Sequence, residues 1–267
     1  MRAAIAALAI VLCAASPARA ADELRYEPWP HAAITTAIGL ATAGEVALRH
    51  DLAPRSCTHC GGNAFDRSIT ESLAWRNHAL ASTLSDVGLV LLPAGALIYG
   101  FAADGGDEGA IDALVFGETF AVNFLVTEAL KYAFARERPM VIYLGKEDPK
   151  VAGRPDDWYV SFPSGHASSS FVSVAALATI ADLRGRDPAP IWLIGLPVAA
   201  GVSYLRVAGL HHWTTDVLAG AALGTILGVG LPRLLHGPGG DGGDDDGDDR
   251  RAAEATPLQV LQLGGRF

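Results

Sequence analysis

The sequence predicts an all-α protein, a helical bundle of about five or six apolar helices that is embedded in a membrane and has its active site at one end. Three observations support this fold class. Half of the 267 residues are hydrophobic, and apolar segments close to the roughly 20 residues that span a bilayer recur along the chain. No alternation typical of strands precedes the C-terminus. Because no segment is uninterrupted over the full spanning length, a soluble helical bundle is the alternative.

The first residues of the chain resemble an export signal. Arg2 supplies a positive start, an apolar run follows it, and an A-x-A cleavage site ends at Ala20. We therefore predict a signal peptide over 1–20 and a main domain over 21–235. An uncleaved first helix is the alternative, and a lipoprotein modified at Cys13 is a weaker one.

Six apolar segments account for the predicted helices. Gly and Ala are frequent in them, as is typical of helices that pack closely in a membrane. Asp112, Glu118 and Glu128 interrupt the third segment, and we expect them to face the bundle interior because charged groups avoid lipid. Glu45 and a short apolar length favour a surface helix for the first segment, although a crossing helix stays open. The segments are 32–48, 84–102, 111–130, 166–181, 190–209 and 214–231.

Two cysteines, Cys57 and Cys60, remain after the predicted cleavage. A structural zinc site usually needs four ligands, whereas this C-x-x-C pair supplies two, and no βαβ pattern surrounds it. We therefore predict a disulfide between them that staples a loop in an oxidising compartment.

The chain ends in an acidic, glycine-rich stretch. We predict that 236–257 is disordered and that 258–267 is a short separate segment without a readable role. Six Asp, one Glu and two Arg between Gly237 and Pro257 contribute −5 to the net charge of −9. This charge argues against a general nucleic-acid binder, and the missing EF-hand spacing argues against a calcium site.

The first stretch with candidate site residues is KYAFARERP, over 131–139. Lys131 and Arg138 are seven residues apart, so two helical turns would place both on one face, and Pro139 would end the helix. Arg136 would then point elsewhere. A macrodipole partner or a membrane-surface anchor explains one basic residue at a helix end, but explains the whole pattern less well.

The second stretch is FPSGHASSS, over 162–170. Pro163 and Gly165 form a turn, and Ser164 can cap the helix that follows. The free N–H groups at such a helix start attract an anion, most naturally phosphate. His166 would stand in the first turn beside that anion.

The third stretch is SYLRVAGLHHWTTD, which contains Arg206, His212 and Asp216. If the chain is helical from His212 onward, Asp216 lies one turn below it and can accept a proton from one imidazole nitrogen. The other nitrogen is then free to act as a nucleophile or base. His211 falls out of this register and is expected to be a surface or interface histidine.

The predicted helix order brings these three stretches together. Antiparallel helices over 166–181 and 190–209 would return His212 to the end of the bundle where His166 begins. The helix that carries Lys131 ends on the same side. We therefore expect one oxyanion-binding site with two imidazoles, one for a nucleophile and one for an acid.

Together, K-x6-RP at 131–139, PSGH at 163–166 and R-x5-H-x3-D at 206–216 resemble the signature of the type 2 phosphatidic acid phosphatase family. Its superfamily includes bacterial class A acid phosphatases and vanadium haloperoxidases. The resemblance covers neither the first 100 residues nor the acidic tail. One position departs from the pattern, because Leu205 stands where the family usually has Ser before the arginine.

The resemblance implies a phosphatase that needs no metal or other cofactor. His212 would attack phosphorus and form a phosphohistidine, while Asp216 would orient His212 and balance its charge. His166 would protonate the leaving oxygen and then activate water. The residues that would hold the phosphate oxygens are Lys131, Arg138, Ser164, Gly165 and Arg206.

The resemblance also implies a phosphorylated lipid as the substrate and the membrane as a partner. We expect the protein in the inner membrane of a bacterial cell envelope, with a periplasmic active site and with Arg184 and Arg186 inside. The alternatives are a soluble periplasmic acid phosphatase of broad specificity, a non-catalytic family member and a vanadate-dependent haloperoxidase. No pattern identifies the lipid or the oligomeric state.

Overall fold

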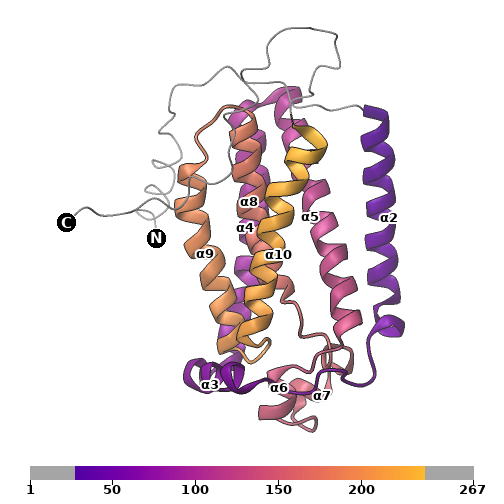
Figure 1. The fold of residues 1–267 in the computed structure, drawn as a ribbon, viewed down its shortest axis with the longest axis vertical. Coiled ribbons are helices and arrows are strands. Elements are labelled where there is room, and N and C mark those ends of the chain that lie inside the picture. The colour runs from indigo at the N-terminus through magenta and orange to yellow at the C-terminus, as the bar shows by residue number, and fades with distance from the viewer. Residues whose placement is uncertain (1–27, 238–267) are drawn as a thin grey trace, which may run out of the picture.

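The fold is a bundle of long helices with short helices and loops gathered at one end (Figure 1). The computed structural model describes residues 28–237, and within this range it contains no strand, only an isolated bridge between His59 and Arg136. The prediction of an all-α bundle is confirmed. The predicted signal peptide, residues 238–257 of the predicted acidic tail and the segment 258–267 lie outside the described residues. The prediction of disorder is wrong for His236, which is buried and ends the last helix, α10 (Thr214–His236).

Six long helices in the described range correspond to the six predicted segments. All of them except the first are long and apolar enough to cross a membrane. Large apolar side chains such as Leu193, Ile226 and Leu234 are exposed on the outside of the bundle, as a lipid environment requires. The helices are α2 (Pro28–Leu52), α4 (His78–Asp104), α5 (Gly106–Phe134), α8 (Gly165–Leu183), α9 (Ala189–Ala208) and α10 (Thr214–His236).

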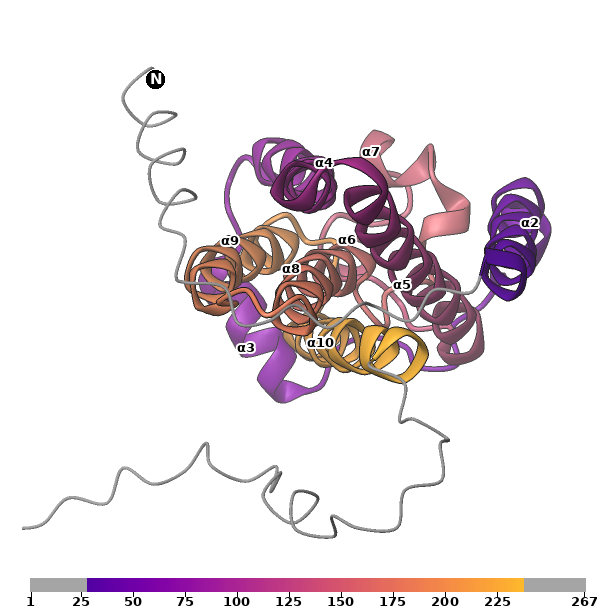
Figure 2. The same ribbon diagram turned by 90° about the horizontal axis from the view of Figure 1, so that it is seen from above.

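Helix α8 occupies the centre, with α4, α5, α9 and α10 around it (Figure 2). Glycines on α10 allow its backbone to approach that of α8 closely. A Cβ added at Gly224 would lie 2.2 Å from the backbone oxygen of Ser168, and one at Gly228 would lie 2.7 Å from Ala175 Cβ. The closest helix contact of the bundle therefore depends on residues without side chains.

The three acidic residues of α5 that were predicted to face the interior do so, since Asp112, Glu118 and Glu128 are all buried. The Arg184 guanidinium lies 2.9 Å from Asp112, at the end of the bundle where α8 finishes. A charge within an apolar helix is thus balanced by a partner from another segment, as burial of charge demands.

Helix α2 lies along α5 and is held there by polar contacts (Figure 1). The Thr35 hydroxyl donates to Glu118 at 2.5 Å, and the Tyr132 hydroxyl donates to Glu45. Glu45 therefore faces a bundle partner, and its presence does not indicate a surface helix. Helix α2 extends along the bundle, but it is not among the described helices that are apolar enough to cross a membrane. The choice between a surface helix and a crossing helix for 32–48 therefore stays a prediction.

The loop end of the bundle holds residues 53–77, 135–164 and 209–213. It includes four short elements that the apolar pattern does not predict, namely α3 (Ala64–Leu73), α6 (Pro139–Tyr143), α7 (Pro149–Ala152) and a 3₁₀ turn (Pro155–Asp157). Cys57 and Cys60 are bonded to each other at this end.

Candidate active site

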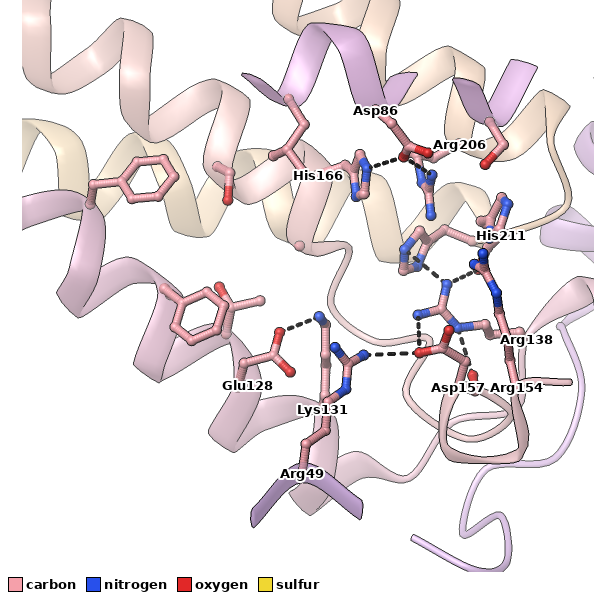
Figure 3. A pocket seen from close by; sticks show the side chains of 18 residues that line it. Arg49, Asp86, Glu128, Lys131, Arg138, Arg154, Asp157, His166, Arg206 and His211 are labelled. Carbon is pink, nitrogen blue, oxygen red and sulfur yellow. Dashed lines mark hydrogen bonds and ion pairs between the residues drawn. The ribbon is translucent and has the colours of Figure 1, made fainter. Parts of the chain in front are cut away.

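A cavity of about 420 Å³ opens at the loop end of the bundle. Five cationic side chains surround it, from α2, α5, α9 and the loops (Figure 3). Of the residues predicted for the site, those that line this cavity are Lys131, Arg138, Gly165, His166, Arg206 and His212. Ser164 and Asp216 are fully buried directly behind the wall. The three sequence stretches therefore converge at one end of the bundle.

Lys131 and Arg138 reach the cavity by different routes. Lys131 lies in the last turn of α5, which ends at Phe134 because Ala135 adopts the left-handed conformation (φ 42°). Arg138 therefore lies in the loop after the helix, and the expected shared helical face is wrong. The Nε atom of Arg138 donates to the backbone oxygen of Asp157 at 2.7 Å, and this bond directs the guanidinium inward.

The start of α8 forms a second wall. The Ser164 hydroxyl accepts from the backbone N–H of Ala167 and caps the helix. A Cβ added at Gly165 would lie 3.0 Å from the Lys131 ammonium, so the glycine leaves room for the cation beside the helix N-terminus. Amide groups and an ammonium group thus face the same space, which suits an anion.

His166 and Arg206 share a carboxylate from α4. The Nε2 atom of His166 lies 2.8 Å from Asp86 Oδ1, and a nitrogen of Arg206 donates to the same oxygen at 3.2 Å (Figure 3). Arg206 also donates to the Ser85 hydroxyl at 3.0 Å. Leu205, the residue before this arginine, has no hydroxyl, and Ser85 of α4 supplies the hydroxyl contact.

His212 is oriented by a backbone carbonyl. Its Nδ1 donates to the oxygen of Ser161 at 2.7 Å, which leaves Nε2 as the unprotonated nitrogen, 3.5 Å from Arg138. The nearest Asp216 oxygen is 3.9 Å from Nδ1, so the expected direct bond from imidazole to carboxylate is absent. Asp216 instead accepts from the Ser161 hydroxyl at 2.6 Å and from the backbone N–H of Trp213 at 2.8 Å.

The charges around His212 favour its neutral form. Burial, together with the guanidinium groups of Arg138 and Arg206, holds the pKa of His212 well below its usual value of 6.5. A neutral imidazole with one nitrogen already hydrogen-bonded has a free electron pair on the other. The site can therefore present a nitrogen nucleophile beside an anion-binding group.

Two further arginines border the cavity and were not predicted. Arg49 of α2 forms an ion pair with Asp157 at 2.9 Å, and Arg154 lies beside them (Figure 3). Burial alone would raise the pKa of Asp157, but Arg138, Arg49 and Arg154 outweigh it and lower that pKa. Asp157 is therefore a fixed anion that holds two of the cations in place.

Other residues around the site escaped the sequence analysis. His211 lines the cavity instead of the surface, and its backbone oxygen accepts from Arg138 at 3.1 Å. Asp86 is the only charged residue between Ala79 and Ala103, and this isolation is a signal that could have identified it. Asp66, which contacts Arg136 at 2.7 Å, has no comparable signal.

Among residues 28–237, no group of three or more His, Cys, Asp or Glu side chains is arranged to hold a metal ion. The arrangement instead offers fixed cations and helix N–H groups for an anion, one oriented imidazole as nucleophile and a second imidazole close by. Phosphoryl transfer requires mainly such positioning and charge stabilisation.

Comparison with known proteins finds similarity over the middle part of the chain. Residues 112–237 match the PAP2 superfamily. An undecaprenyl-diphosphatase of Sulfolobus acidocaldarius is 33% identical over 109 residues, which are 41% of this chain and 48% of that protein. A lipid A 1-phosphatase of Porphyromonas gingivalis is 33% identical over 104 residues, which are 39% of this chain and 19% of that protein.

Each of these alignments thus spans less than half of the relative's length. Among solved structures, a transmembrane PAP2-type phosphatidylglycerolphosphate phosphatase from Bacillus subtilis aligns with a TM-score of 0.45 and 20% identity, over 76% of this chain and 94% of that one.

Proposed function

With the PAP2 superfamily resemblance confirmed over residues 112–237, we propose that this protein is a membrane phosphatase that hydrolyses a lipid phosphate or diphosphate through a phosphohistidine intermediate. The observation that carries the proposal is the hydrogen bond from His212 Nδ1 to Ser161. It directs the free Nε2 electron pair toward the cation-lined cavity.

The reaction has two steps. In the first, Nε2 of His212 bonds to the terminal phosphorus, the bond from that phosphorus to the leaving oxygen breaks, and His166 gives that oxygen a proton. The leaving oxygen is that of the lipid in a monophosphate and that of the inner phosphate in a diphosphate. In the second, His166 takes a proton from water, the water oxygen bonds to phosphorus, and the bond from phosphorus to nitrogen breaks to release inorganic phosphate. The groups that stabilise the phosphoryl oxygens are Lys131, Arg138, Arg206 and the N–H group of Gly165. The predicted phosphate contact of Ser164 is wrong, because its N–H donates to the backbone oxygen of Asp216 at 3.0 Å and its hydroxyl caps α8.

Asp216 acts on His212 indirectly in this scheme. Its carboxylate is bonded to the Ser161 hydroxyl and to the backbone of Trp213. These bonds fix the segments on either side of the imidazole. The negative charge, 3.9 Å from Nδ1, also balances the positive charge that develops on the ring.

A lipid substrate is supported by the shape and composition of the cavity. Leu89, Phe120 and Phe124 line it next to the charged groups, so an apolar chain and a phosphate can be bound together. Arg49 and Arg154 place two more positive charges at the border, which supports substrates with a second phosphate group.

The placement at the outer face of the membrane is supported by the disulfide between Cys57 and Cys60. It lies at the loop end, and disulfides persist in oxidising compartments. In a bacterial cell envelope this arrangement gives a periplasmic active site in the inner membrane.

The purified protein tests the proposal when assayed with EDTA present against undecaprenyl diphosphate, phosphatidic acid, phosphatidylglycerol phosphate and a soluble phosphate ester. We expect phosphate release, fastest from a lipid substrate. An acid-labile, alkali-stable phosphoenzyme should be trapped from the wild type but not from His212→Ala. Preference for the soluble ester, with no protein in carbonate-washed membranes, would favour a soluble acid phosphatase instead.

A further inference from the structure

A second charged cluster lies behind the cavity wall, where the proposed reaction gives Arg136 and Asp66 no role. Asp66 of α3 and Asp216 of α10 are both fully buried, and Arg136 lies between them. One guanidinium nitrogen of Arg136 donates to Asp66 at 2.7 Å. The other donates to Asp216 and, at 2.7 Å, to the Thr215 hydroxyl. The cluster therefore joins three segments that are distant in the chain.

Asp66 also holds the first turn of α10 directly. Its carboxylate accepts from the backbone N–H of Thr215 at 2.9 Å and from the Thr215 hydroxyl at 2.8 Å. A carboxylate at a helix start satisfies free N–H groups and interacts favourably with the helix dipole. The position of α3 thus determines where α10 begins.

Asp216 carries this constraint to the nucleophile. Ser161 orients His212 through its backbone carbonyl, and the Ser161 hydroxyl donates to Asp216. The same carboxylate binds the backbone N–H of Trp213, the residue after His212. A continuous path of buried polar contacts therefore runs from Asp66 to the imidazole.

Stability alone is a weak explanation for this cluster. Two buried carboxylates share one guanidinium, and buried ion pairs often contribute little net stability because desolvation is costly. In some proteins, such pairs instead fix one arrangement among several. A nucleophile gains from such fixation, since a displacement of about 1 Å can cost about 10²-fold in rate.

We propose that Asp66 is a positioning residue of the phosphatase reaction, which acts through Arg136 and Thr215 to hold Asp216, Ser161 and His212 in register with the cavity. Asp66 lies outside the matched residues 112–237. The inference rests on the proposed function.

The central test is Asp66→Asn, assayed with the best lipid substrate and with inorganic phosphate as product inhibitor. We expect kcat to fall about 10- to 100-fold, whereas KM and the inhibition constant of phosphate stay within about twofold. The reason is that the cations that bind phosphate do not contact Asp66. The matched control is Glu71→Gln, an exposed carboxylate on the same helix, which should keep the wild-type kcat.

A double variant tests whether the effect passes through Arg136. If it does, Asp66→Asn combined with Arg136→Gln should be no slower than Arg136→Gln alone. Thermal unfolding in detergent separates positioning from loss of folded protein. If Asp66→Asn fails to fold, Thr215→Ala, which removes hydrogen bonds but no charge, should lower kcat about threefold or more without changing KM.

Several outcomes would overturn the inference. The first is an unchanged kcat in folded Asp66→Asn or, if that variant fails to fold, in Thr215→Ala. The second is a change that affects only KM or the inhibition constant of phosphate. The third is a loss in the double variant that equals the sum of the two single losses in free energy. A wild-type protein that releases no phosphate would refute the proposed function and the inference together. An active wild type with an equally active Asp66→Asn would refute the inference alone.

Discussion

His211 and His212 are neighbours in the chain, and both line the cavity, but their chemical settings differ. His212 is almost fully buried and donates Nδ1–H to Ser161. The hydrogen bonds of His211 use its backbone, whose N–H donates to the oxygen of Arg206 at 3.0 Å and whose oxygen accepts from Arg138. Of these two residues, only His212 has an imidazole whose tautomer is fixed by a short hydrogen bond, so the choice between them as nucleophile rests on geometry.

The first prediction separates these two histidines. His212→Ala should lower kcat by about 10³-fold or more, because the covalent route is lost. His211→Ala should retain activity within about tenfold of the wild type, since its side chain carries no step. Phosphate release at saturating substrate measures both, and equal losses in the two variants would show that the assignment is wrong.

The second prediction concerns pH. A positive neighbour disfavours the protonated imidazole, so Arg138 helps to keep the pKa of His212 low. In Arg138→Gln that pKa should rise toward 6.5. As the pH is lowered, kcat/KM should then begin to fall at a higher pH than in the wild type, because protonated His212 cannot attack.

The overall rate of Arg138→Gln should also fall by about 10²- to 10³-fold, since one oxyanion contact is lost. Profiles of kcat/KM against pH for both proteins provide the measurement. Arg233→Gln, at the opposite end of the bundle, is the control and should leave the acid limb in place. An acid limb at the same pH in Arg138→Gln would contradict the electrostatic argument.

Sequence patterns located six of the residues that line the cavity, because the three motifs are local and chemically distinctive. They did not predict how His212 is held. The partner of Nδ1 is the backbone oxygen of Ser161, and any residue type can supply a backbone oxygen. Asp66 and Asp86 were missed for a related reason, since they come from helices outside the motifs and meet the site only through tertiary packing.

Among the elements, helices were predictable where apolar length dominates. The apolar runs 84–102 and 190–209 correspond to α4 and α9, whose ends lie within six residues of the predicted ends. The end of α5 was not predictable, because Ala135 has a high intrinsic helix propensity. A hydrogen bond to a distant segment outweighs this propensity, since the Thr58 N–H donates to the Ala135 oxygen at 3.0 Å.

The third prediction belongs to the contact between α8 and α10. Gly224→Ala places a Cβ against backbone atoms of α8 that cannot move independently, so the helices must separate. We expect a destabilisation of about 1–3 kcal/mol, as for other overpacked contacts. Thermal unfolding in detergent measures it, with Gly230→Ala as the control, since a Cβ there would meet no atom within 4 Å. Equal unfolding temperatures for the two variants would contradict the packing argument.

At the scale of the whole molecule, α2 links the two ends of the bundle. Arg49, near the C-terminus of α2, pairs with Asp157 at the loop end. Thr35 donates to Glu118, which lies in the first half of α5 and so farther from the loop end. The Pro28 end of α2 therefore lies toward the end opposite the cavity. If α2 crosses the membrane, residue 28 and the active site face different compartments.

This connection makes orientation the fourth prediction. An N-terminus released outside by cleavage after Ala20, followed by a crossing α2, would place the cavity inside. The disulfide at the loop end favours a cavity outside. We expect Glu147→Cys at the loop end to react with a membrane-impermeant maleimide in intact cells, and Ala189→Cys at the opposite end to react only after lysis. Both positions are exposed, so accessibility is matched. The reverse pattern would refute the outer-face placement, and reaction at both positions in intact cells would show that the bundle does not span the membrane.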